Sequence, residues 1–141
     1  MKGWPTKDNT REAQFAGQFY PGNKNALTQQ LDELFEQAKI LTTVSTRNQP
    51  LQAVIVPHAG YVFSGLVAAA AYHQIPENAV YKRVFVLASS HRYSFNGATV
   101  FCTGNYKTPL GEVKVDTQLS KELLNSSELF TDYKEAHENE H

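Results

Sequence analysis

The chain has 141 residues, of which 41% are hydrophobic and 19% charged, and its formal net charge is -1. This length and composition suit one globular domain and exclude a chain that is disordered throughout. No cluster of Lys and Arg marks a nucleic-acid interface, and no segment approaches the ~20 apolar residues of a membrane helix. Because Met1–Asp8 lacks the apolar run of a secretory signal and the single cysteine cannot form an internal disulfide, we expect a cytoplasmic protein.

The first third of the chain predicts one long helix between two polar segments. Residues 1–10 are polar, and we expect them to be flexible. Apolar side chains recur on one helical face between residues 25 and 40, which predicts a helix there. Either Asn23 or Asn25 can cap its start. The polar run 44–50 is expected to be a linker.

The middle of the chain predicts a strand, a helix and a second strand. Residues 51–56 and 83–88 are short β-branched runs typical of buried strands. Between them, the alanine-rich segment Leu66–Gln74 predicts a helix with Ser64 as its N-cap. A βαβ unit of this kind brings its two strands parallel in one sheet. We therefore predict an α/β fold with a mostly parallel central sheet flanked by helices.

The last third predicts shorter elements. Residues 98–102 favour a third strand, and Tyr106–Gly111 has the composition of a turn. Polar and apolar residues alternate over 112–116, as in a short exposed strand. A helix is predicted from Leu119 to Leu124.

Two histidines follow the predicted buried strands directly. His58 lies in the loop Pro57–Tyr61, and His91 lies in the loop Ser89–Arg92. Ligands of open α/β sheets bind beyond the carboxyl ends of the strands, and neutral imidazole is the most frequent metal ligand among side chains. Two histidines at equivalent strand ends therefore predict a metal site, although a polar loop residue is the usual role of a single histidine.

A literal zinc-peptidase motif lies at the end of the sequence. His137 to His141 match H-E-x-x-H, in which two histidines on one helical face bind zinc and the glutamate acts as base. The flanking residues are polar and form little apolar stripe, and no third ligand follows His141, so we treat a zinc peptidase as a minor alternative. Cys102 is interpreted as a small buried strand residue rather than as a nucleophile.

The sequence resembles the Memo-like family, which includes the bacterial AmmeMemoRadiSam system protein B, from Arg11 to its end. The string PHAGYxxSG at 57–65 is the most specific of the shared motifs. The others are Arg11 with Ala16–Pro21, Ser89–His91, Tyr106–Gly111 and Glu140-His141.

The resemblance implies an α/β fold similar to class III extradiol ring-cleaving dioxygenases, which use non-haem Fe(II). It implies that His58 and His91 line a metal site, for which iron and copper have both been proposed. The family's third ligand is a cysteine far downstream, which Cys102 does not match. We therefore expect residues 11–141 to be the N-terminal portion of such a domain, truncated at its C-terminus, with weak or absent metal binding in this chain. Further candidate pocket residues are Tyr61, Ser90 and His141.

Three functions remain open from the sequence. The first is a metal-dependent redox enzyme related to the dioxygenases, with Fe(II) or Cu as cofactor and an unknown small molecule as substrate. The second is a non-enzymatic peptide-binding adaptor, because animal members of the family are described as signalling adaptors. The third is the zinc peptidase. We expect no nucleic-acid or membrane partner, and an uncovered apolar face would favour a homo-oligomer.

Overall fold

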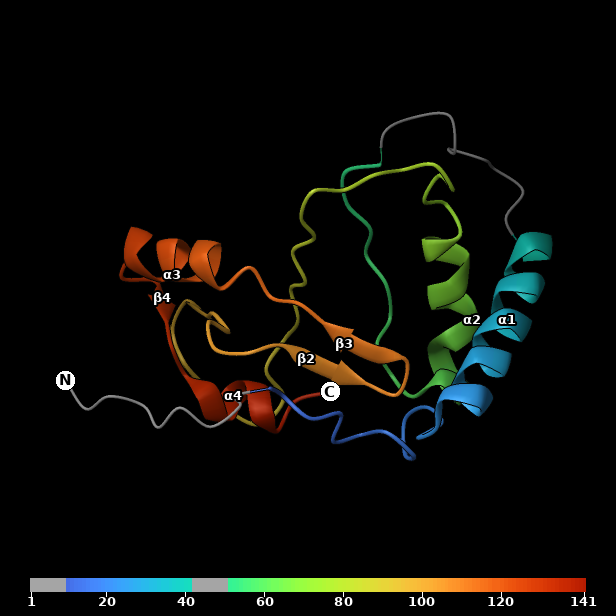
Figure 1. Ribbon diagram of the computed structural model, residues 1–141, viewed down its shortest axis with the longest axis horizontal. Helices are drawn as coiled ribbons and strands as arrows, with labels where there is room; N and C mark the ends of the chain where they lie inside the picture. The colour runs from blue at the N-terminus through green and yellow to red at the C-terminus, as the bar shows by residue number, and fades with distance from the viewer. Residues whose placement is uncertain (1–9, 42–50) are drawn as a thin grey trace. The chain divides into compact units, whose positions relative to one another are not determined.

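The computed structural model describes residues 10–41 and 51–141 (Figure 1). These residues form two compact units. The helix-pair unit comprises residues 15–87, and the strand unit comprises residues 10–14 and 88–141. The predictions of a flexible segment before residue 10 and of a linker at 44–50 lie outside the described residues.

The helix-pair unit begins with the predicted long helix. Helix α1 spans Lys24–Leu41, which confirms the helix predicted at 25–40. Of the two candidate caps, Asn23 is the one used: its side-chain oxygen accepts a hydrogen bond from the Ala26 main-chain N–H at 2.9 Å. Leu27 and Ala38 are buried on the inner face of α1.

Helix α2 spans Tyr61–Tyr72, so the prediction that it begins at Leu66 was wrong. Gly60 occupies the N-cap position, and the Tyr61 main-chain N–H donates to the Phe19 carbonyl at 2.8 Å. A neighbouring segment thus satisfies a helix-start donor, and no side-chain cap is needed. Ser64 lies inside the helix and donates to the Ala59 carbonyl at 2.9 Å.

The close packing of α1 against α2 depends on a small residue. A Cβ atom added at Gly65 would lie 2.9 Å from Cδ1 of Leu34, which is closer than carbon atoms normally approach. The absence of a side chain at Gly65 therefore lets α2 lie close to α1.

The two segments predicted as buried strands are not strands in the described structure. Residues 51–56 and 83–88 join no ladder within the described ranges. Their apolar side chains are largely in solvent: Ile55 is 99% exposed and Val86 87% exposed. β-Branched runs favour an extended backbone, but a buried strand also needs partner strands and covering layers, which the described residues do not supply.

The strand unit contains a small parallel sheet, which with the helices confirms the α/β class. Strand β1 (Ala98–Thr99) pairs in parallel with strand β4 (Phe130–Thr131), with Ala98 opposite Phe130. The predicted third strand, 98–102, is thus shortened to its first two residues. Strand β4 was not predicted, because two residues are too few to show a period.

An antiparallel hairpin accompanies this sheet. Strand β2 (Tyr106–Thr108) pairs with strand β3 (Gly111–Val113), so the predicted turn at Tyr106–Gly111 is the tip of a hairpin together with one of its arms. The exposed strand predicted at 112–116 is confirmed only in its first part.

Two helices complete the strand unit. Helix α3 (Thr117–Ser126) extends the helix predicted from Leu119 to Leu124, and the Asp116 carboxylate caps it by accepting from the Leu119 N–H at 3.0 Å. The short helix α4 (Lys134–Glu138) was not predicted. No helix in the described ranges has the length and apolar character needed to cross a bilayer.

Candidate metal centre

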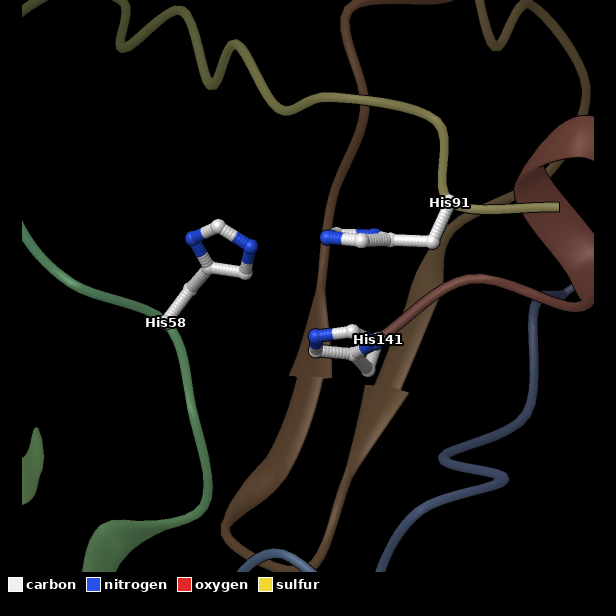
Figure 2. Close-up of side chains that lie close together, drawn as sticks. All are labelled: His58, His91 and His141. Atoms are coloured by element: carbon white, nitrogen blue, oxygen red, sulfur yellow. The ribbon is translucent and has the colours of Figure 1, made fainter. Parts of the chain in front are cut away.

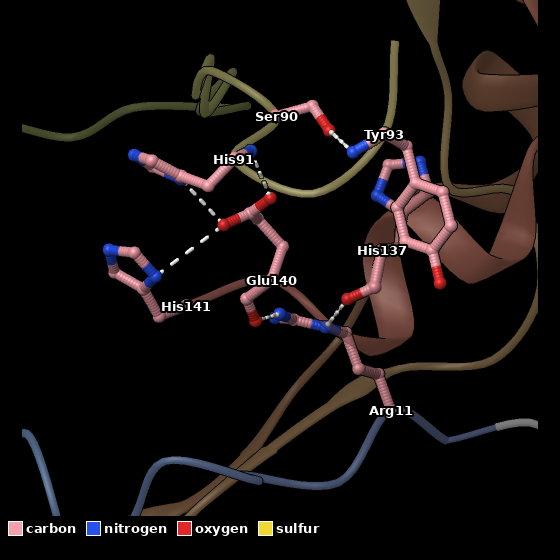
Figure 3. A network of polar contacts seen from close by, with 7 residues as sticks. All are labelled: Arg11, Ser90, His91, Tyr93, His137, Glu140 and His141. Atoms are coloured by element: carbon pink, nitrogen blue, oxygen red, sulfur yellow. Dashed lines mark hydrogen bonds and ion pairs between the residues drawn. The ribbon is translucent and has the colours of Figure 1, made fainter.

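A buried carboxylate holds the His91 loop in the strand unit (Figure 3). Glu140 is only 8% exposed, and its Oε2 accepts a hydrogen bond from the main-chain N–H of His91 at 2.7 Å. Its other oxygen, Oε1, lies 2.6 Å from Nδ1 of the His91 ring. The same side chain therefore fixes both the backbone and the imidazole of His91.

His141 lies against His91 and shares this carboxylate. Figure 2 draws His58, His91 and His141 as sticks; the rings of His91 and His141, which belong to one unit, stack with centroids 4.6 Å apart and planes inclined by 27°. Nδ1 of His141 is 3.4 Å from Oε1 of Glu140. Both imidazoles thus turn Nδ1 toward one carboxylate oxygen, and in each ring Nε2 is the nitrogen away from it.

The surroundings of Glu140 favour its ionised form. Burial on its own would raise the pKa of the Glu140 carboxyl group, but the hydrogen bonds from the main chain and ring of His91 outweigh it and lower the pKa below its usual value. Two histidines and one carboxylate therefore form a polar cluster with a negative charge at its base.

Arg11 holds the chain segment that carries Glu140. Its Nε donates to the carbonyl oxygen of His137 at 2.5 Å, and its Nη2 donates to the carbonyl oxygen of Glu140. The guanidinium also lies over the Tyr106 ring, 5.2 Å from the centroid, while the Arg11 main chain bridges to the same residue in β2. Arg11 thus satisfies carbonyls at the end of α4, where a cation is favoured.

His137 belongs to a different cluster from His141. Its Nε2 lies 3.1 Å from Oγ1 of Thr99, and its ring lies 5.6 Å from that of Phe101. Burial, and secondarily the charge of Arg11, lower the pKa of His137. Because α4 ends at Glu138, the two histidines of the H-E-x-x-H string do not share a helical face. The zinc-peptidase alternative lacks the geometry on which its motif depends.

The other predicted site residues occupy distinct places. Ser90 shapes the His91 loop, since its Oγ accepts from the Tyr93 main-chain N–H at 3.2 Å. His58 and Tyr61 belong to the helix-pair unit, where His58 lies just before α2 and Tyr61 is its first residue. Burial raises the pKa of the Tyr61 hydroxyl, whose ring packs 5.6 Å from that of Tyr20.

Cys102 has the buried environment expected for it. Its thiol donates to Oδ2 of Asp132 at 3.4 Å, and burial together with this carboxylate raises the pKa of the thiol. A raised pKa reduces the thiolate fraction that would be needed for a nucleophile or a metal ligand.

Sequence reasoning missed the role of Glu140. It recorded Glu140 only as half of a shared dipeptide, and Arg11 only as part of an N-terminal motif. A carboxylate next to a candidate histidine ligand is a usable signal, because metal-binding histidines commonly donate their second nitrogen to a carboxylate.

The fold and this cluster define an α/β protein in which one buried carboxylate contacts a pair of histidines. A family model described as "Memo-like protein" matches residues 11–141, and the chain belongs to this family.

Curated relatives agree with this assignment. The chain is 38% identical over 116 residues to "Protein memo-1 homolog" of Caenorhabditis elegans, covering 82% of this chain and 31% of that protein. It is 37% identical over 113 residues to "Protein MEMO1" of Xenopus laevis, covering 80% and 36%. A "MEMO1 family protein" of Sulfurisphaera tokodaii is 33% identical over 133 residues, covering 89% and 46%. The chain therefore spans less than half the length of these relatives.

Proposed function

We propose that this chain carries histidine ligands of a divalent metal site, with His91 and His141 as its core. The observation that supports this most directly is the shared carboxylate: Glu140 Oε1 lies 2.6 Å from Nδ1 of His91 and 3.4 Å from Nδ1 of His141. A carboxylate on one imidazole nitrogen, with the other nitrogen turned away, is the usual arrangement of histidine metal ligands.

His58 is proposed as the third histidine ligand. It stands in the most specific motif of the family resemblance, directly before α2, and the resemblance implies that its counterpart lines the metal site. Three imidazoles suit a borderline transition metal such as Fe(II) or Cu better than they suit Mg²⁺ or Ca²⁺, which prefer oxygen ligands.

The proposed activity is that of a metal-dependent redox enzyme related to the non-haem iron dioxygenases, acting on a small molecule. The metal would supply electron transfer to a bound oxidant and open positions for substrate. The residues of this chain would bind it, and Glu140 would keep the histidines oriented. Because the chain spans less than half of the relatives' length, this activity is proposed for the family's whole protein rather than for residues 11–141 alone.

Metal titration tests the ligand assignment. We would titrate metal-free protein with Fe(II) under anaerobic conditions and determine Kd for the wild type and for His58→Ala, His91→Ala and His141→Ala. Each of these variants should weaken binding at least tenfold. His73→Ala, at the C-terminal end of α2, is the matched control and should bind like the wild type. Equal affinity in His91→Ala and wild type would refute the proposal.

A peptide-binding adaptor is the second candidate, favoured by exposed apolar residues on α2. Val62, Phe63 and Val67 are all exposed on this helix, and such side chains are typical of helix-mediated recognition. Peptide binding that persists in the presence of a chelator, and is lost in Phe63→Asp, would support this function over the enzyme. Peptide binding that requires metal would contradict it.

A further inference from the structure

We infer that Glu140 is the positioning residue of the histidine pair, and that it fixes the tautomer in which Nε2 of His91 and of His141 carries the lone pair. This inference rests on the proposed metal site, because it concerns the same two histidines. It goes beyond that proposal by assigning a role to a side chain that would not itself touch the metal.

The hydrogen bonds of Glu140 determine which nitrogen of His91 is protonated. A glutamate side chain is ordinarily a carboxylate at neutral pH, and a carboxylate can only accept hydrogen bonds. Oε2 is occupied by the His91 main-chain N–H at 2.7 Å, which orients the carboxylate plane. The other oxygen, Oε1, lies 2.6 Å from Nδ1 of His91. Because Oε1 can only accept, Nδ1 must carry the proton of this hydrogen bond. In a neutral imidazole with Nδ1 protonated, Nε2 is the lone-pair nitrogen.

Glu140 also contacts His141, its neighbour in sequence. Because Glu140 directly precedes His141, one carboxylate oxygen reaches Nδ1 of His141 at 3.4 Å while it also contacts His91 from a loop 49 positions earlier. The stacked rings then present the same nitrogen, Nε2, away from the carboxylate. A single acid thus favours the same tautomer in two potential ligands, through a hydrogen bond to His91 and a longer electrostatic contact with His141.

Arg11 holds the main chain of residue 140 in place. The guanidinium of Arg11 binds the carbonyl oxygens of His137 and Glu140, so the backbone of residue 140 is held independently of its side chain. A substitution of the carboxylate can therefore change the imidazole contact without releasing the chain segment.

Glutamine at position 140 distinguishes this role from simple packing. Glu140→Gln keeps the size of the side chain but replaces one acceptor oxygen with an NH₂ donor. If the amide oxygen accepts from the His91 main chain, the NH₂ group faces Nδ1, and this favours the opposite tautomer with the proton on Nε2. The matched control is Glu138→Gln, which replaces a half-buried acid on α4 paired with Lys134.

Nitrogen NMR of the metal-free chain provides the direct readout. Histidine-selective ¹⁵N labelling and long-range ¹H–¹⁵N spectra at pH 7.5 identify the protonated nitrogen of each ring, and His91→Ala and His141→Ala assign the signals. Wild type and Glu138→Gln should show Nδ1–H for both rings, and Glu140→Gln should move His91 to Nε2–H. If Glu140→Gln fails to fold, the wild-type spectrum still decides, because an Nε2–H tautomer for both rings there overturns the inference.

Co(II) affinity provides the second readout. Glu140→Gln should weaken Co(II) binding by roughly 10- to 100-fold, the usual effect of removing a carboxylate partner of a metal-binding histidine, and Glu140→Asp should recover part of it. Unchanged tautomers and Co(II) affinity within twofold of wild type in Glu140→Gln would overturn the inference while leaving the metal site intact. Unchanged Co(II) affinity in His91→Ala would instead remove the metal site itself, whereas the tautomer result would stand.

Discussion

The two units of the chain differ in what holds them together. In the strand unit, polar side chains contact main-chain groups far away in sequence, as Arg11 does with the carbonyls of His137 and Glu140. In the helix-pair unit, α1 packs against α2, while the segments 51–56 and 83–87 leave apolar side chains in solvent. The candidate site is therefore kept in shape by directional hydrogen bonds rather than by a large apolar core.

The largest loss of stability is expected from Gly97→Ala in the strand unit. Gly97 has φ of 83°, and a Cβ atom there would lie 2.1 Å from the Leu129 carbonyl oxygen beside the β1–β4 pair. Left-handed strain and a backbone clash together should cost about 4 kcal/mol or more in urea unfolding. Gly17→Ala, with φ of 85° and open space, is the control and should cost only about 1 kcal/mol. Equal losses of stability in Gly97→Ala and Gly17→Ala would mean that the close approach of residue 97 to the Leu129 carbonyl is not required for stability.

A somewhat smaller loss is expected in the helix-pair unit from Leu27→Ala. Leu27 is 3% exposed on the inner face of α1, and removing a buried leucine side chain typically costs about 3 kcal/mol. Hydrogen exchange should show faster opening of α1 and α2, with little change in the strand unit. Uniform acceleration over both units would show that they unfold together.

Arg11→Met should cost about 2 kcal/mol, because it removes two charge-assisted hydrogen bonds while keeping an unbranched apolar stem. The control is Lys39→Met in α1, where an exposed ion pair with Glu36 is worth less than about 0.5 kcal/mol. Chemical denaturation of both variants measures the difference. A loss in Lys39→Met as large as in Arg11→Met would contradict the importance of the long-range contacts.

A smaller effect is expected from His137→Gln, which should weaken the dependence of the free energy of unfolding on pH at acidic pH. Because burial and Arg11 lower the pKa of His137, the unfolded chain takes up more protons than the folded chain just below the ordinary value of 6.5. Stability is therefore highest above that pH and decreases as the pH falls through the lowered pKa. Urea unfolding at pH 7.5 and pH 5 should show a smaller difference in the variant, and an unchanged difference would assign the slope to other groups.

The smallest effect is expected from Ile55→Thr. Ile55 is 99% exposed, so the substitution should change the free energy of unfolding by less than about 0.5 kcal/mol. Size-exclusion chromatography should also show whether it reduces self-association of this apolar segment. A loss comparable to that of Leu27→Ala would mean that residues 51–56 are covered in solution.

Sequence patterns predicted the features that depend on local periodicity and capping. The apolar period predicted α1, and Asn23 was one of its two candidate caps. The sequence patterns failed where an element depends on a distant segment. Helix α2 begins at Tyr61 because the Phe19 carbonyl accepts the Tyr61 N–H, and local patterns give no information on such a contact. The residues 51–56 had the composition of a strand, but a composition cannot supply the partner strands that burial requires.

The candidate site was predictable in part for the same reason. His91 was selected as a residue at a strand end, yet the segment before it is not a strand, and Glu140 and Ser90 hold its loop instead. The contact between His91 and Glu140 joins residues 49 positions apart, so it could be inferred only from the chemistry that histidine ligands need. His58 as a ligand of the same metal stays a prediction.

The contacts of Arg11 have a consequence for biosynthesis. They join residues separated by 126 and 129 positions, whereas α1 and α2 lie close together in sequence. Loop-closure entropy makes such distant pairings late events, and a chain emerging from the ribosome folds its N-terminal parts first. The helix pair can therefore assemble while translation continues. The contacts of Arg11, and the hydrogen bonds between Glu140 and the His91 loop, can form only after residue 140 has left the exit tunnel.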